Sequence, residues 1–250
     1  MKTATRIQRA EVTNQKSGSR ITPPRNAALR AKRAFTLIEL LAVIAVIGVL
    51  AGLSFPAIRA AKLSILRARA KAELTQVESV IERFQQKLGY YPPDNPTNWP
   101  LNQLYYELLG TTNIGTVAAP VYLTLDGSAQ INGANLPTTF GFAVTGFVNC
   151  TRPGKGDDVA GAIPFVKSLK PSQFLLTTLP GNPTVLGSTI EGPLMYLSAA
   201  GGKLNPWRYN SSSPRYSTKS YDLWIDVTAG DKTNRICNWS DKPLVVGAPY

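Results

Sequence analysis

The 250-residue sequence contains no histidine, only two cysteines and only two methionines. The lack of histidine excludes the Ser-His-Asp and Cys-His forms of nucleophilic catalysis and removes the commonest protein ligand of metal ions. The two cysteines, Cys150 and Cys237, allow at most one internal disulfide bond. They could be bonded if the domain lies outside the cytoplasm, and they could equally be buried free thiols.

Acidic residues are also scarce. The chain has 15 of them and 27 lysines and arginines, which gives a net charge of +12. Such a charge is typical of nucleic-acid-binding proteins, but its location argues against that function. Residues 1–34 contain nine lysines and arginines and one glutamate, so they carry +8 of the +12. The rest of the chain resembles an ordinary soluble surface, and we expect no nucleic-acid partner.

Residues 1–34 are polar and basic, include Pro23 and Pro24, and show no apolar period. This composition predicts a disordered leader. Positive charge that precedes a first membrane segment is retained in the cytoplasm, so we expect the N-terminus inside the cell and the rest of the chain outside.

Residues 35–58 form the long apolar run of the sequence, with one acid, Glu39, and no positive charge before Arg59. A run of this length predicts a single transmembrane helix. A secretory signal peptide is the rival interpretation, but its apolar core is shorter and is followed closely by a cleavage site. The only well-placed Ala-x-Ala site, Ala68-Arg69-Ala70, lies among charged residues, which disfavours cleavage there.

Helical periodicity continues through residues 59–89, where apolar residues recur every three or four positions and charged residues fill the other faces. We therefore expect one helix of about 54 residues, with Pro56 kinking it rather than ending it, and Gly89 followed by Pro92-Pro93 closing it. The residues of the apolar stripe are Leu66, Ala70, Leu74, Val77, Ile81, Phe84 and Leu88.

Residues 90–250 are expected to form an α+β head, with a small antiparallel sheet packed on the amphipathic half of the helix. Asn98 is the predicted N-cap of a short helix that ends at Gly110, and residues 111–190 read as an insertion without a clear pattern. Residues 171–178 are predicted to form a second short helix, and Asp226–Arg235 to form a loop. The expected strands lie at residues 121–125, 140–148, 194–197, 207–210, 221–227 and 243–246.

The stretch Lys32-Arg33-Ala34-Phe35-Thr36-Leu37-Ile38-Glu39 resembles the prepilin-type cleavage and methylation motif of type IV pilins and of the pseudopilins of type II secretion. The resemblance implies that a prepilin peptidase cuts between Ala34 and Phe35 and methylates the new amine of Phe35. It implies that Glu39 pairs with that amine in a neighbouring subunit during filament assembly. Ala34 departs from the family, which usually has glycine before the cut.

The C-terminal part carries a second resemblance, to the end of the major pseudopilin of type II secretion. It rests on Asn205-Pro206-Trp207-Arg208-Tyr209, Tyr221-Asp222-Leu223-Trp224 and Ile236-Cys237-Asn238-Trp239, together with Tyr91-Pro92. The major pseudopilins hold calcium after the strand that begins at the position of Asp222. Here that loop offers Asp226 and Asp231 beside Lys232 and Arg235, which is a poor ligand set for calcium. We therefore expect no cofactor, and calcium held with the help of backbone carbonyls stays open as the alternative.

The sequence therefore predicts a pseudopilin rather than an enzyme: a single-pass protein of the inner membrane with a periplasmic head. Its expected partners are other copies and other pseudopilins, the prepilin peptidase, an assembly platform in the inner membrane, and lipid. Two alternatives stay open. One is a type IV or competence pilin that serves adhesion, motility or DNA uptake, and the other is a membrane-tethered enzyme or binding module with its site in residues 111–190.

Overall fold

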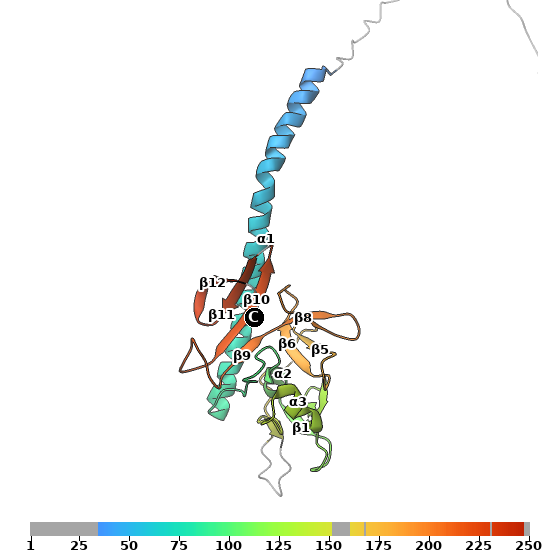
Figure 1. Cartoon of the computed structure of the whole chain (residues 1–250), viewed down its shortest axis with the longest axis vertical. Coiled ribbons are helices and arrows are strands. Elements are labelled where there is room, and N and C mark those ends of the chain that lie inside the picture. Colours follow the sequence, from blue (N-terminus) through green and yellow to red (C-terminus); the bar gives the residue numbers. More distant parts are fainter. Residues whose placement is uncertain (1–34, 152–160, 168, 231, 248–250) are drawn as a thin grey trace, which may run out of the picture. The chain divides into compact units, whose positions relative to one another are not determined.

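The computed structural model describes residues 35–151, 161–167, 169–230 and 232–247. The chain divides into two units, residues 1–51 and 52–250, and helix α1 (Leu37–Leu88, 52 residues) contributes to both (Figure 1). The predicted long helix is thus confirmed, and it continues without interruption through Pro56. The predicted leader, including Ala34, lies outside the described residues.

Both ends of α1 follow from the local sequence. At its start, the hydroxyl of Thr36 accepts a hydrogen bond from the backbone N–H of Glu39 at 3.3 Å. At its end, Gly89 adopts a positive φ of 86° and donates its N–H to the carbonyl of Gln85. Glycine reaches this left-handed conformation without the steric cost of a side chain, so the helix ends where the sequence predicts.

The described residues of the second unit form three four-stranded sheets rather than the expected single small sheet. The C-terminal sheet has the order β12-β11-β10-β9 and is antiparallel throughout. Its strands are β9 (Arg208–Asn210), β10 (Asp222–Ala229), β11 (Lys232–Cys237) and β12 (Ser240–Val246).

The other two sheets come mostly from the predicted insertion, which therefore has regular structure. One has the order β3-β2-β1-β4 with a parallel β1–β4 pair, and the other has the order β5-β6-β8-β7. Short helices α2 (Leu104–Leu109), η1 (Gly133–Asn135) and α3 (Leu136–Phe140) accompany them. The strands are β1 (Thr111–Asn113), β2 (Val121–Thr124), β3 (Gln130–Asn132), β4 (Cys150–Thr151), β5 (Phe174–Leu176), β6 (Thr184–Ser188), β7 (Tyr196–Leu197) and β8 (Lys203–Pro206).

The core of the second unit forms around the predicted apolar stripe of α1. Ala70, Leu74, Ile81 and Phe84 are fully buried, and Val77 is almost so. They belong to one cluster with alternate residues of β10, and Leu66 and Leu88 pack at its margin. The periodicity of the helix and the alternation of the strand are therefore both confirmed, because each places its apolar side on the shared core.

Four local predictions were wrong. Residues 140–148 do not form a strand, because Phe140 ends α3 and the chain continues irregularly to β4. Residues 171–178 form a turn followed by β5 instead of a helix, and Asn98 lies in a turn while Gln103 occupies the N-cap of α2. The predicted loop Asp226–Arg235 is instead the paired hairpin of β10 and β11.

Candidate functional site

The N-terminal end of α1 is closed by a reciprocal pair of side chains. The carboxylate oxygen Oε2 of Glu39 accepts hydrogen bonds from the backbone N–H and from the hydroxyl of Thr36, both at 2.8 Å. Together with the bond from the Glu39 N–H to the Thr36 hydroxyl, this is a capping box. Glu39 is thus held by its own chain, in an exposed position four residues beyond Phe35.

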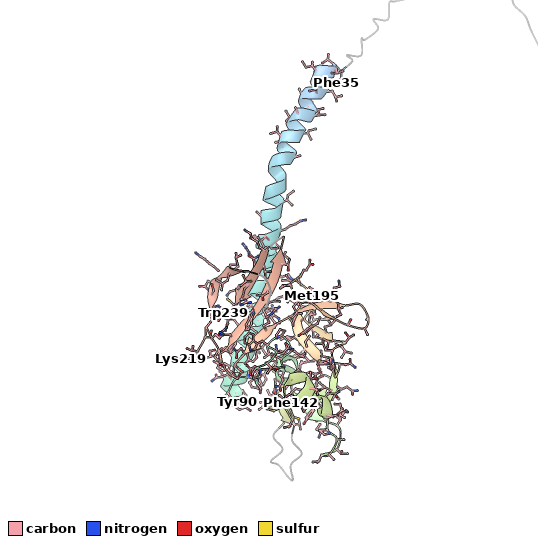
Figure 2. All side chains as sticks on the ribbon, in the orientation of Figure 1. Phe35, Tyr90, Phe142, Met195, Lys219 and Trp239 are labelled. Carbon is pink, nitrogen blue, oxygen red and sulfur yellow. The ribbon has the colours of Figure 1, made fainter. Side chains whose placement is uncertain are left out.

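The apolar side chains of the first unit are exposed on all faces of the helix. Phe35 is 78% exposed at the start of the described chain, where Figure 2 labels it. The exposed apolar residues include consecutive positions of the helix, so they lie on every face. Further along α1, by contrast, the apolar residues form a stripe on one face. The other large apolar residues exposed in the first unit are Leu37, Ile38, Leu40, Leu41, Val43, Ile44, Val46, Ile47, Val49 and Leu50.

No helix within the described part of the chain reaches the combination of length and apolar character that a membrane crossing requires.

Basic residues of α1 join the second half of the helix to the C-terminal sheet. Arg67 donates from its guanidinium to the side-chain oxygen of Asn234, and the Lys71 ammonium donates to the carbonyls of Cys237 and Ser240 at 3.3 and 3.5 Å. Arg69 donates to the hydroxyl of Thr189 at 2.8 Å. The contacts of Arg67 and Lys71 hold the C-terminal sheet on α1, whereas Arg69 contacts the residue that follows β6 in another sheet.

Pro56 lies within α1, where its side chain is not described, so the predicted kink stays a prediction.

The two cysteines are unbonded in the structure. Cys150 begins β4 beside β1, whereas Cys237 ends β11 in the C-terminal sheet. They thus belong to different sheets, and the bonded alternative is not the one the structure adopts. Burial raises the pKa of the Cys237 thiol, which keeps it protonated and weakly reactive.

The carboxylate of Asp226, one of the two possible calcium ligands in the sequence, forms an ion pair with Arg235. Its Oδ1 and Oδ2 accept hydrogen bonds from Nε and Nη2 of Arg235 at 2.8 and 3.1 Å. Asp226 and Arg235 are directly opposite each other in the β10–β11 ladder. A carboxylate held in this two-point ion pair is a poor metal ligand, and Asp231 lies outside the described residues. The described residues contain no group of three or more histidine, cysteine or acidic side chains placed to hold a metal ion.

Glu107 of α2 is the buried acid nearest to the region where an enzymatic site was considered. Its two carboxylate oxygens accept hydrogen bonds at 2.8 Å from the backbone N–H groups of Val148 and Asn149. Burial raises the pKa of Glu107 to about 7. Because the side chain is fully buried and holds the chain segment before β4, its role is structural.

Sequence reasoning missed two further acids that organise loops of the head. The Asp222 carboxylate accepts backbone N–H bonds from Arg215, Tyr216 and Ser217, and Asp94 accepts those of Ser211 and Ser212. The Ser-rich segment between β9 and β10 has many backbone N–H groups that need hydrogen-bond acceptors, and this need is visible in the sequence. The local sequence does not identify which acidic side chain accepts them.

Comparison with known proteins is informative for the N-terminal region. A family model described as the prokaryotic N-terminal methylation motif matches residues 29–55. Searches of the curated proteins and of the solved structures returned no match. The matched segment contains the predicted cleavage position, Phe35 and Glu39, and it supports a type IV pilin-like chain that carries a prepilin-type N-terminus.

Proposed function

We propose that this chain is a pseudopilin of a type II secretion system: a subunit that is cleaved, N-methylated and assembled into a periplasmic filament for protein export. One observation carries the proposal. The apolar residues at the start of α1 are exposed in the isolated chain, and they lie within the segment that the methylation-motif model matches. Exposed apolar surface of this extent requires another apolar phase, and lipid followed by neighbouring subunits would supply it.

Processing would separate residues 1–34 from the mature subunit. The basic leader would hold the N-terminus in the cytoplasm, and the prepilin peptidase would cut between Ala34 and Phe35. Removing residues 1–34 would also lower the net charge from +12 to +4, since the leader carries +8. A mature chain with so little excess charge supports protein partners over nucleic acid.

Assembly would use Glu39 as the acceptor of the new amine. In the isolated chain Glu39 accepts two bonds from Thr36, so its carboxylate is satisfied before a partner arrives. In a filament the methylated amine of Phe35 from a neighbouring subunit would replace or join these donors. A charge pair formed in an apolar setting sets the register of one helix against the next, because a shifted helix would leave both charges unpaired.

The head would remain in the periplasm while the apolar half of the helix crosses the inner membrane. Other copies, other pseudopilins and the inner-membrane assembly platform would be its protein partners. The energy for assembly would come from a separate cytoplasmic ATPase. The membrane-tethered enzyme is less well supported, because the buried acid beside the insertion serves the fold.

Mass spectrometry of the mature N-terminus tests this proposal. In cells with an active prepilin peptidase, the chain should begin at methylated Phe35. A chain that keeps Met1, or one that begins near Ala70, would contradict it. Ala34→Gly serves as the matched variant, and it should be processed at least as fast, because glycine is the residue that the family uses at this position.

Deleting the gene for this chain distinguishes a pseudopilin from a true pilin, because the two predict different losses of function. Loss of a pseudopilin should stop export of secreted proteins while leaving DNA uptake and surface adhesion intact. The purified mature chain should bind DNA weakly at low salt, without the steep salt dependence of a DNA-uptake subunit.

A further inference from the structure

A cavity of about 650 Å³ opens on the face of the C-terminal sheet that looks away from the apolar core. Its floor comes from alternate residues of β10, namely Trp224 and Asp226, while the intervening residues enter the core. Arg208 lies opposite Trp224 in the β9–β10 ladder, and Arg235 lies opposite Asp226 in the β10–β11 ladder. Strand register therefore gathers one indole, two guanidinium groups and one carboxylate at one place.

Arg208 is deeply buried yet poorly compensated by the described residues around it. It is 7% exposed, and its Nε lies 3.7 Å from Oδ2 of Asp226. That oxygen already accepts Nη2 of Arg235 at 3.1 Å. The other bonds of Arg208 are long, at 3.4 Å to the side-chain oxygen of Asn205 and 3.4 Å to the carbonyl of Pro206. A guanidinium has five N–H donors, so this environment leaves capacity for a further acceptor.

The effect of burial on Arg208 agrees with this geometry. Burial lowers the pKa of its guanidinium, and the nearby positive charge of Arg235 adds to that effect, while Asp226 opposes it. A buried cation is stable when an anion pairs with it closely, and at 3.7 Å Asp226 is a loose partner that Arg235 already holds.

Trp224 supplies apolar surface beside Arg208, and its own indole N–H is enclosed by protein. Its side chain lines the same cavity and is 6% exposed, and its indole N–H has no hydrogen-bond partner in the described structure. Trp99 packs edge-on against Trp224, with ring centroids 5.5 Å apart, and Pro193 adds apolar surface to the cavity lining.

We propose that this cavity binds a carboxylate-bearing ligand, with the carboxylate on Arg208 and the attached carbon chain against Trp224, Trp99 and Pro193. A guanidinium matches the two oxygens of a carboxylate in geometry and charge. The surrounding aromatic and proline surface suits a short apolar stem, and the volume lies in the usual range of ligand sites. An acidic residue of a partner protein and a free organic acid share this chemistry.

The site differs in position and chemistry from the assembly motif at Phe35 and Glu39. It lies entirely in the second unit, and it needs neither processing nor the apolar start of α1. Loss of ligand binding and loss of filament assembly are therefore separate results.

Fluorine NMR of the full chain in detergent, with 5-fluorotryptophan at its four tryptophans, tests the proposal. The probes are acetyl-Gly-Glu-Gly-amide, its glutamine counterpart acetyl-Gly-Gln-Gly-amide, and glutarate. The glutamate peptide or glutarate should shift the Trp224 and Trp99 signals saturably, and the glutamine peptide should bind at least tenfold more weakly. Trp207, fully buried outside this cavity, should not respond.

The probes also distinguish the two sources of the carboxylate. A glutamate peptide that binds at least tenfold more tightly than glutarate indicates an acidic residue of a protein chain, and equal or tighter binding of glutarate indicates a free acid. If neither acid shifts the two signals, or if the glutamate and glutamine peptides bind equally, the proposal is overturned.

Arg208→Gln should weaken binding of the better acid at least tenfold. Lys219→Gln is the control, because it removes one positive charge from an exposed position outside the cavity (Figure 2). Equal affinities of the two variants would overturn the role of Arg208. The comparison of the two peptides uses the unaltered chain, so it decides the proposal even where Arg208→Gln fails to fold.

Discussion

The two halves of α1 are both rich in apolar residues, but their surroundings differ. Beyond residue 66 the apolar residues form one stripe, and the chain's own sheets bury it. In residues 35–50 they occupy every face, and each large apolar side chain is about half exposed or more. The first pattern completes the fold of one subunit, whereas the second prepares surface for something outside the chain. The predictions below test this contrast, from the largest effect to the smallest.

Truncating matched leucines should affect stability only in the buried half. Leu74→Ala removes a fully buried side chain from the core, and it should lower the free energy of unfolding by about 2–5 kcal/mol. Leu41→Ala removes a side chain that is 54% exposed, and the effect should stay within about 0.5 kcal/mol. Denaturant unfolding of the full chain in detergent measures both, and equal losses would break the contrast.

Replacing Glu107 by its neutral isostere, glutamine, should lower the stability of the head. Glu107→Gln places an NH₂ group against the N–H of Val148 or Asn149, so we expect a loss of about 1–3 kcal/mol. Glu191→Gln, on an exposed side chain, is the control and should change stability little. Thermal unfolding measures the difference, and an unaffected Glu107→Gln would remove the structural role assigned to this acid.

The same residue predicts a pH dependence. The pKa of Glu107 is raised from 4.5 to about 7 in the folded chain, so the folded state binds this proton more tightly than the unfolded state does. Its contribution to stability is therefore full below about pH 4.5 and is lost as the pH rises through about 7. Unfolding curves between pH 5 and 8 should show this decline in the native chain and lack it in Glu107→Gln.

Lys71 should contribute modestly to holding the C-terminal sheet on α1. Lys71→Met keeps most of the side-chain length but removes the bonds to the carbonyls of Cys237 and Ser240, at a cost of roughly 1 kcal/mol. Hydrogen exchange should become faster in β11 and β12 and stay unchanged in β1–β4. Lys87→Met, exposed in the last turn of α1, is the matched control and should leave both regions as they are.

The thiols should give the smallest effect. Because Cys150 and Cys237 are unbonded, a reducing agent should leave the unfolding midpoint unchanged. Alkylation of the denatured, unreduced chain should add two labels, as counted by mass spectrometry. A chain that takes no label until it is reduced would show that the two thiols are bonded in solution.

The sequence predicts the parts of this fold that depend on local periodicity. The stripe from Leu66 to Leu88 and the alternation in β10 are visible because buried positions recur at the period of a helix or a strand. Strand β11 escaped prediction because Lys232, Asn234 and Arg235 make it polar, and its pairing with β10 and β12 decides its structure.

The interactions of the site depend on contacts that no local pattern encodes. Glu107 meets Val148 and Asn149 more than 40 positions along the chain, and Arg208 meets Asp226 across a sheet. By contrast, the processing motif is contiguous, so Phe35 and Glu39 could be identified directly. Even there, the sequence interpretation missed that Thr36 and Glu39 satisfy each other, although the spacing Thr-x-x-Glu at a helix start predicts it.

Filament incorporation of Glu39→Ala tests the central contrast most directly. Cells that make this variant should insert and process it like the native chain, because its apolar helix and its cleavage site are intact. We expect the processed variant to remain as single subunits in the membrane fraction and to be absent from periplasmic filaments captured by chemical cross-linking, since the amine of Phe35 loses its acceptor. Native levels of Glu39→Ala in those filaments would contradict the account.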